Sequence, residues 1–115
     1  MEIRLLKEPI TLSEVATLAK EQFGEMIKAV VDVERELMAL GGELHSDEEA
    51  LLLEDGSSQE NLWGINIYPE KSVEERIEFD SMINIRPSQN NRSRGVEDAQ
   101  TRKRIIEVIK KMILP

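Results

Sequence analysis

The sequence contains no cysteine, one histidine and few aromatic residues: one Trp, one Tyr and two Phe in 115 residues. The lack of cysteine excludes a disulfide framework, a thiol nucleophile and a cysteine metal site. No apolar run approaches the ~18 residues that span a bilayer. The opening "MEIRLLKEPITLSE" is interrupted by charges where a secretory signal needs an apolar core. We therefore expect a soluble cytoplasmic protein with no membrane partner.

The composition that remains favours a small folded domain. Hydrophobic residues make up 40% of the chain and charged residues 33%, which is enough apolar material for a core. A chain of this size commonly buries roughly two thirds of its unfolded surface without disulfides or metals. We expect a single globular domain over residues 1–115, with no cofactor.

The charge is distributed unevenly. The formal net charge is -8, with seven Lys and Arg against twenty Asp and Glu up to Ile85, and eight against three from Arg86 onward. The overall acidity disfavours long-range attraction to nucleic acid, although a local basic surface could still hold phosphate. The alternative that we favour is that the two halves neutralise each other within one fold.

Three apolar segments are typical of strands. These are "EIRLL" over 2–6, "NLWGINIYP" over 61–69 and "IEFDSMINIRP" over 77–87. In the last of them apolar and polar residues alternate, which predicts one buried and one polar face. Only a short linker separates the last two segments, so this pair is expected to be antiparallel.

Three further segments begin with helix-capping patterns. Thr11 and Glu14 form a capping box, and Ser46 with Glu49 repeats the pattern before "ALLLEDG". Asp98 is the predicted N-cap of a final helix whose apolar residues recur at helical spacing up to the last turn.

The segment from Met26 to Leu40 admits two interpretations. Its apolar residues follow a helical spacing, but "AVVDV" is rich in β-branched residues and "ERE" separates two short apolar runs as a hairpin turn would. We choose the hairpin. The predicted order is then β-α-β-β-α-β-β-α, an α+β fold in which helices pack on one face of a largely antiparallel sheet.

These same stretches carry a family resemblance. "KAVVDVERELMALGGELHSDEEALLLEDGS", "LWGINIYPE" and "IEFDSMINIRPSQNNRSRGVED" together resemble a family of short, single-domain prokaryotic proteins catalogued only as a domain of unknown function. The similarity covers nearly the whole chain and implies a complete single-domain member, but no activity. Such sequences often have a glycine after the "DVE" turn, where this chain has "ERE".

Two residues are candidates for acid–base chemistry. His45 lies just before a predicted helix among carboxylates, where it could act as a general base, and Asp80 lies in the polar row of the 77–87 strand. The structural alternatives are a turn residue for His45 and a solvated sheet face for Asp80. A lone histidine lacks partner ligands, so no metal site is predicted.

A dense polar loop follows this strand. From Arg86 to Asp98 it contains three Arg, three amide side chains and two Ser. Its arginines and backbone amides could converge on an anion at the start of the last helix, or the arginines could pair with the surplus carboxylates of the protein, which we favour. The candidate ligand-binding residues are Asn84, Arg86, Ser88, Asn91, Arg92 and Arg94.

Three functions remain open. The first is a structural or interaction protein that could be a homodimer, favoured because no HExxH, P-loop, GxGxxG or nucleophile-elbow motif occurs. The second is a small enzyme or a domain that binds a small anionic ligand in a cleft near the 86–98 loop. The third is a nucleic-acid-binding regulator that uses Arg102, Lys103 and Arg104, which is disfavoured because no aromatic side chain lies in that segment.

Overall fold

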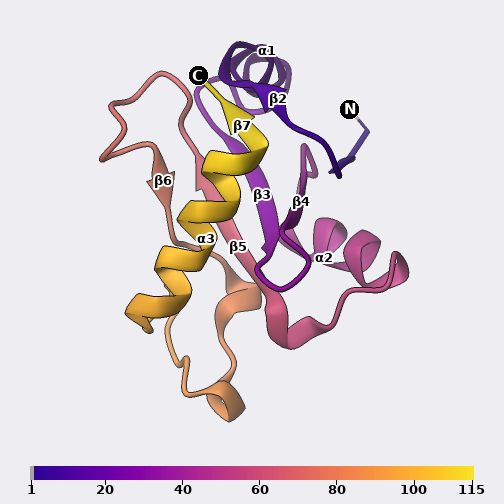
Figure 1. Ribbon diagram of the computed structural model, residues 1–115, viewed down its shortest axis with the longest axis vertical. Coiled ribbons are helices and arrows are strands. Elements are labelled where there is room, and N and C mark those ends of the chain that lie inside the picture. Colours follow the sequence, from indigo (N-terminus) through magenta and orange to yellow (C-terminus); the bar gives the residue numbers. More distant parts are fainter. Residues whose placement is uncertain (1) are drawn as a thin grey trace.

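The computed structural model describes residues 2–115 of the chain and has an α+β fold (Figure 1). Within that range the helices are α1 (Leu12–Gln22), α2 (His45–Glu54) and α3 (Ala99–Met112). The strands are β1 (Arg4–Leu6), β2 (Ile10–Thr11), β3 (Ile27–Asp32), β4 (Leu37–Leu40), β5 (Leu62–Ile67), β6 (Ile77–Glu78) and β7 (Ile113–Leu114). None of these helices is long and apolar enough to cross a membrane.

Five strands form one antiparallel sheet in the order β1-β4-β3-β5-β6. The predicted hairpin between residues 26 and 40 is confirmed as β3 and β4, in which Asp32 faces Leu37 across the turn. The Asp32 carboxylate accepts hydrogen bonds from the N–H groups of Glu34 and Arg35, both at 2.9 Å. These bonds fix the turn, as Asx motifs commonly do. The predicted antiparallel pairing of β5 and β6 is also confirmed.

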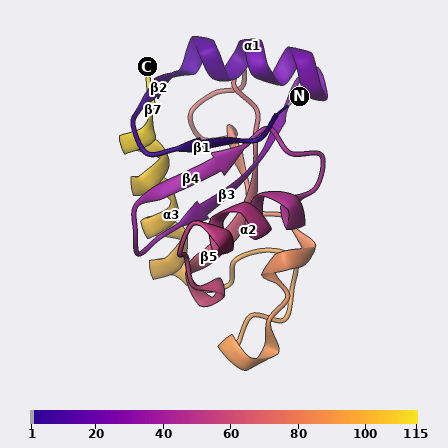
Figure 2. The ribbon, with the colours of Figure 1, turned by 90° about the vertical axis from the view of Figure 1, so that its right-hand side faces the viewer.

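The helices cover both faces of the sheet, whereas the sequence analysis expects them on one face. α1 and α3 pack against the face that carries Ala29 and Ile65, in the larger core cluster. Leu52 of α2 packs on the opposite face, against Val30 and Leu62 in a second cluster. Figure 2 shows α2 and α3 separated by the sheet. The physical reason is that Val30, Leu37, Ala39 and Leu62 form an apolar patch on the second face as well, and α2 buries it.

Two of the three predicted helix caps are confirmed. Thr11 Oγ1 accepts a hydrogen bond from Glu14 N at 3.1 Å, and Asp98 Oδ2 accepts from Thr101 N at 2.9 Å. The predicted Ser46 cap is wrong, because the N-cap of α2 lies two residues earlier, at Leu44, which has no side-chain capping bond. His45, the first residue of α2, instead hydrogen-bonds the Ile65 carbonyl of β5 through its side chain.

The predicted strand over 77–87 is much shorter in the structure. β6 pairs with β5 only at Ile77 and Glu78, and the chain then forms 3₁₀ turns at Met82–Asn84 and Pro87–Gln89. The chain is held beside β5 by side-chain hydrogen bonds in place of a strand ladder, so the period-two pattern does not continue as a strand. A further pair was not predicted: β2 and β7 form a two-residue parallel ladder that joins the segment before α1 to the segment after α3.

Candidate functional site

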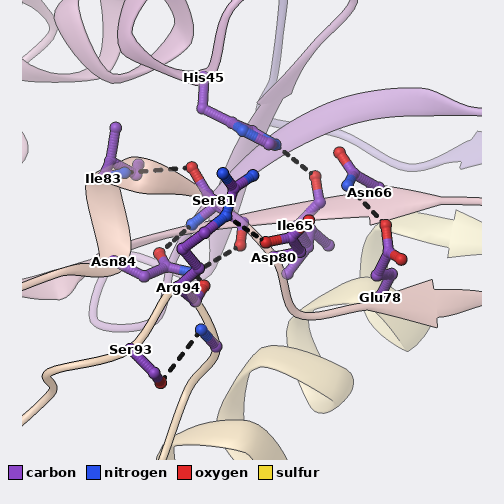
Figure 3. A network of polar contacts seen from close by, with 12 residues as sticks. His45, Ile65, Asn66, Glu78, Asp80, Ser81, Ile83, Asn84, Ser93 and Arg94 are labelled. Atoms are coloured by element: carbon purple, nitrogen blue, oxygen red, sulfur yellow. Dashed lines mark hydrogen bonds and ion pairs between the residues drawn. The ribbon is translucent and has the colours of Figure 1, made fainter.

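The segment after β6 is held against β5 by Asn84, whose side chain is completely buried (Figure 3). Its Oδ1 accepts a hydrogen bond from Gly64 N at 2.8 Å, and its Nδ2 donates to the carbonyls of Gly64 and Arg94 at 3.0 and 2.9 Å. The amide thus presents to β5 the donor and acceptor that a neighbouring strand would present.

Asn91 holds the loop from within. Its Nδ2 donates to the carbonyls of Asn84 at 2.7 Å and Gly95 at 2.8 Å, and its Oδ1 accepts from Glu97 N at 2.8 Å. Both amide residues were predicted as ligand-binding residues. Their polar atoms are engaged within the protein, so they position the loop.

Arg86 is also engaged internally. Its guanidinium stacks on Trp63 with 4.1 Å between Cζ and the ring centroid, and it donates to the backbone carbonyls of Gln59 and Leu62, the latter at 2.7 Å. Partial burial lowers the pKa of Arg86. Planar stacking and several donors in one fork are features that lysine could not reproduce.

The loop before α3, where an anion was one of the two alternatives, already holds a carboxylate. Glu97 Oε2 accepts hydrogen bonds from the backbone N–H groups of Arg92 at 2.7 Å and Ser93 at 2.9 Å. These bonds, with a smaller contribution from the Arg92 charge, lower the pKa of Glu97. The loop amides before α3 are therefore satisfied by a residue of the loop itself.

The remaining loop candidates differ in their surroundings. Arg94 Nε forms an ion pair with Asp80 Oδ1 at 2.6 Å, and both side chains are about half exposed. Ser88 and the Arg92 side chain are exposed, and neither side chain has a hydrogen-bond partner among residues 2–115. Only the Arg94 part of the expected internal pairing of arginines with carboxylates is therefore present in the loop.

Arg94 borders a polar depression on the α2 face of the sheet. The depression has a volume of about 240 Å³ and lies where the first turn of α2, strand β3 and the 79–95 segment meet. Its lining residues are Lys28, Leu44, His45, Ser46, Ser81, Met82, Ile83 and Arg94. Sequence reasoning identified His45 and Arg94 but missed Lys28, Ser46 and Ser81 as members of one site, because only the tertiary fold brings their elements together.

Gly64 makes this close packing possible. A Cβ atom at position 64 would lie 2.5 Å from Ser81 Cβ and 3.2 Å from His45 Cδ2. A Cβ atom essentially never lies as close to another atom as 2.5 Å, so only glycine lets Ser81 pack this closely on β5. Ser81 is itself buried, and its Oγ accepts from Ile83 N at 3.2 Å.

His45 has the most distinctive geometry of the lining residues. It is only 7% exposed, and its Nε2 lies 2.8 Å from the Ile65 carbonyl, to which it donates. Burial lowers the pKa of His45, and the charges of Lys28 and Arg94 lower it further, against the raising effects of the Ile65 hydrogen bond and Asp80. The imidazole is therefore neutral near pH 7, with Nδ1 as its acceptor.

The electrostatics of the depression favour an anion. Lys28 and Arg94 supply positive charge from two different segments. Leu44, His45 and Ser46, at the start of α2, also line the depression, so the positive end of the helix dipole lies beside it. The ammonium of Lys28 also lies 5.6 Å from the Phe23 ring centroid. Among residues 2–115 no three His, Asp or Glu side chains gather in a way that could hold a metal ion.

Comparisons with known proteins identify a family for which no activity is described. No curated protein and no solved structure matches the chain. A family model described as "Protein of unknown function (DUF5674)" matches residues 4–112. The match covers almost the whole chain, and the protein therefore belongs to this family of unknown function.

Proposed function

We propose that the protein binds a small oxyanion, or a small molecule that carries one, in the depression at the start of α2. The observation that carries this proposal is that Lys28, His45 and Arg94, from three separate segments, line one depression beside a helix N-terminus. Anions are stabilised at such a place by positive charge and by backbone N–H groups that have no partner inside the helix.

The packing around the depression supports this proposal. Asn84 and Asn91 fix the backbone of the 79–95 segment, so Arg94 reaches the depression from a braced loop. In the proposed role, the guanidinium of Arg94 gives up part of its ion pair with Asp80 and contacts the anion instead. An exposed ion pair of this kind contributes at most about 1 kcal/mol, so the exchange costs little.

The proposal can be tested by titrating the protein with sodium phosphate and sodium sulfate at matched ionic strength. Thermal unfolding and backbone amide shifts give the readout. We expect stabilisation that grows with anion concentration, reaching about 2.7 kcal/mol at a hundredfold excess over Kd, and amide shift changes confined to residues around 28, 45–47 and 81–94.

Matched variants separate specific binding from general salt effects, since phosphate and sulfate stabilise most proteins through exclusion from their surface. Lys28→Gln and Arg94→Gln should abolish the site-specific part. Arg92→Gln, in the same loop but outside the depression, and Lys103→Gln, on exposed α3 surface, should retain it. An equal response of all four variants to both anions would contradict the proposal.

An interaction protein, with a homodimer as one form, is the second candidate, and one surface favours it. A groove between α3 and the segment before β6 is lined mainly by apolar side chains, including Ile77 and Ile106, and Val73 at its edge is 68% exposed. Sedimentation over a range of concentrations tests this. A dimer that Val73→Asp dissociates and Leu53→Asp leaves intact would support it, and a monomer at all concentrations would exclude the homodimer.

A further inference from the structure

We propose that the depression selects an oxyanion that carries a hydroxyl hydrogen, such as hydrogenphosphate, over one that has only acceptor oxygens, such as sulfate. This inference rests on the proposed function, because it names the class of anion that the same site takes. It follows from the orientation of one buried ring, His45, and from what surrounds that ring.

The orientation of His45 is fixed by β5. A backbone carbonyl only accepts hydrogen bonds, so the 2.8 Å contact of Nε2 with Ile65 O places the ring hydrogen on Nε2. The neighbouring Cδ2 atom lies against Gly64, near enough that a Cβ there would be 3.2 Å away. The Cδ2–Nε2 edge of the ring therefore faces the strand, and Nδ1 lies on the other edge.

Nδ1 is the ring atom left for a ligand. His45 lines the depression, and its Nδ1 has no hydrogen-bond partner within residues 2–115. The side chain is more than nine-tenths buried. Because burial and the nearby charges of Lys28 and Arg94 lower the pKa of His45, Nδ1 carries a lone pair and not a hydrogen at neutral pH.

This acceptor decides between anions. Lys28, Arg94 and the first N–H groups of α2 are donors, and the hydroxyl of Ser46 can donate or accept, whereas the Nδ1 of a neutral His45 can only accept. Hydrogenphosphate can give its P–OH hydrogen to Nδ1 and receive hydrogen bonds from the donors. Sulfate has no hydrogen to give, so one of its oxygens would face the lone pair of Nδ1 with no hydrogen between them, and such a contact is unfavourable.

Calorimetric titration of the wild-type protein with sodium phosphate and with sodium sulfate, at pH 7 and equal ionic strength, tests the inference. We expect phosphate to bind at least tenfold more tightly than sulfate. In His45→Gln, whose side-chain amide can donate to either anion, this ratio should fall toward one, while Arg92→Gln should keep the wild-type ratio.

A measurement on the wild type tests the inference even if His45→Gln fails to fold. The chain has one histidine, so a long-range ¹H–¹⁵N spectrum reports its tautomer without assignment. The Nε2–H form in the free protein is expected, and the Nδ1–H form would overturn the inference. Equal affinity for the two anions, or tighter binding of sulfate, would overturn the selection and leave the proposed function standing. Binding of neither anion would overturn both.

Discussion

The side chain of Asn84 forms hydrogen bonds with both backbone polar groups of Gly64: Oδ1 accepts from the N–H at 2.8 Å and Nδ2 donates to the carbonyl at 3.0 Å. One amide side chain thus continues the sheet where β6 has ended. Since the same Nδ2 also donates to the carbonyl of Arg94, the loop that borders the depression depends on this residue.

Replacing Asn84 by alanine is therefore expected to be strongly destabilising. Asn84→Ala leaves buried backbone groups of Gly64 without partners, and each such group costs about 1–3 kcal/mol. We expect a loss of about 2–4 kcal/mol of unfolding free energy, measured by urea denaturation. Ser88→Ala, in the exposed part of the same loop, should change it by less than about 0.5 kcal/mol, and an Asn84→Ala protein as stable as Ser88→Ala would contradict this role.

The elements that the sequence predicts well are those with a local cause. The Thr11 and Asp98 caps place a side-chain oxygen three residues before the N–H that it accepts from. The β3–β4 hairpin follows from two short apolar runs on either side of a polar turn, the first of them rich in β-branched residues. Each of these depends on a few neighbouring residues, which a sequence pattern records directly: a polar oxygen at the cap, or two short apolar runs separated by a polar turn.

The predictions are wrong where a contact between residues far apart in the sequence determines the local structure. Asn84 occupies a polar position in an alternating segment, and nothing in that pattern distinguishes an exposed amide from one that hydrogen-bonds Gly64. α2 begins at His45, whose side chain hydrogen-bonds the distant Ile65 carbonyl, and no local pattern records that contact. The placement of α2 on the second face could have been inferred from the unbroken apolar run of β4, Leu37–Leu40, which is typical of a strand buried on both sides.

The candidate site was predictable only in part, because contacts between residues far apart in the sequence assemble it. His45 and Arg94 belong to chemically conspicuous segments and were identified. Lys28 lies alone in an apolar strand, and only the pairing of β3 with β5 brings it near them. No local spacing connects positions 28, 45 and 94.

Glu36 gives a stability prediction of the opposite sign. It has φ +56° at the end of the β3–β4 turn, a left-handed conformation that costs a residue with a Cβ about 1–2 kcal/mol. Glycine removes that strain but loses about 0.5–1 kcal/mol through its larger unfolded-state entropy. Glu36→Gly should therefore stabilise the protein by about 0.5–1 kcal/mol, seen as a higher urea midpoint.

A control for this change lies in the same turn. Glu34 does not have a positive φ, so Glu34→Gly gains no relief of strain and should lower the midpoint. The ion pair of Glu36 with Lys111 spans 3.6 Å between two exposed side chains and contributes little. A fall in stability for both glycine variants would contradict the strain at Glu36.

The ion pair between Arg94 and Asp80 should stabilise the fold only weakly. Its Nε–Oδ1 distance is 2.6 Å, but solvent screens both half-exposed side chains. A double-mutant cycle with Arg94→Gln and Asp80→Asn should give a coupling free energy under about 1 kcal/mol, and Arg92→Gln alone should have no measurable effect. A coupling above about 2 kcal/mol would mean that the pair is a structural requirement and would argue against its exchange for a ligand.

Glu97 is expected to control local order in the loop. Because its pKa in the folded protein is lowered by the N–H groups of Arg92 and Ser93, its contribution is present above the ordinary glutamate pKa and is lost as the pH falls through the lowered value. Glu97→Gln weakens these bonds at every pH. Amide hydrogen exchange at Arg92 and Ser93 should accelerate in this variant and stay unchanged in Glu107→Gln, on exposed α3 surface. If amide hydrogen exchange at Arg92 and Ser93 were unchanged in both variants, Glu97 would not order the loop.

Glu48 gives the clearest pH dependence. The side chain is fully buried in α2, its Oε2 accepts from Gly42 N at 3.0 Å, and its Oε1 has no partner in residues 2–115. Burial raises the pKa of Glu48 to about 9, against the lowering effects of the Gly42 hydrogen bond and Lys28. Between the unfolded value and about 9, the folded protein keeps a proton that the unfolded chain releases.

The sign of the effect follows from this difference in bound protons. The unfolded state binds fewer protons in that window, so the contribution of Glu48 to stability falls as the pH rises, by up to about 1.4 kcal/mol per pH unit. Glu48→Gln keeps the shape and the acceptor for Gly42 but has no proton to lose. Its stability relative to the wild type should therefore increase between pH 7 and 8.5, by up to about 2 kcal/mol, as measured by urea denaturation at both pH values. Glu43→Gln, an exposed neighbour before the helix, should show a constant difference from the wild type. If the Glu48→Gln difference were equally constant, Glu48 would have to be ionised in the folded protein.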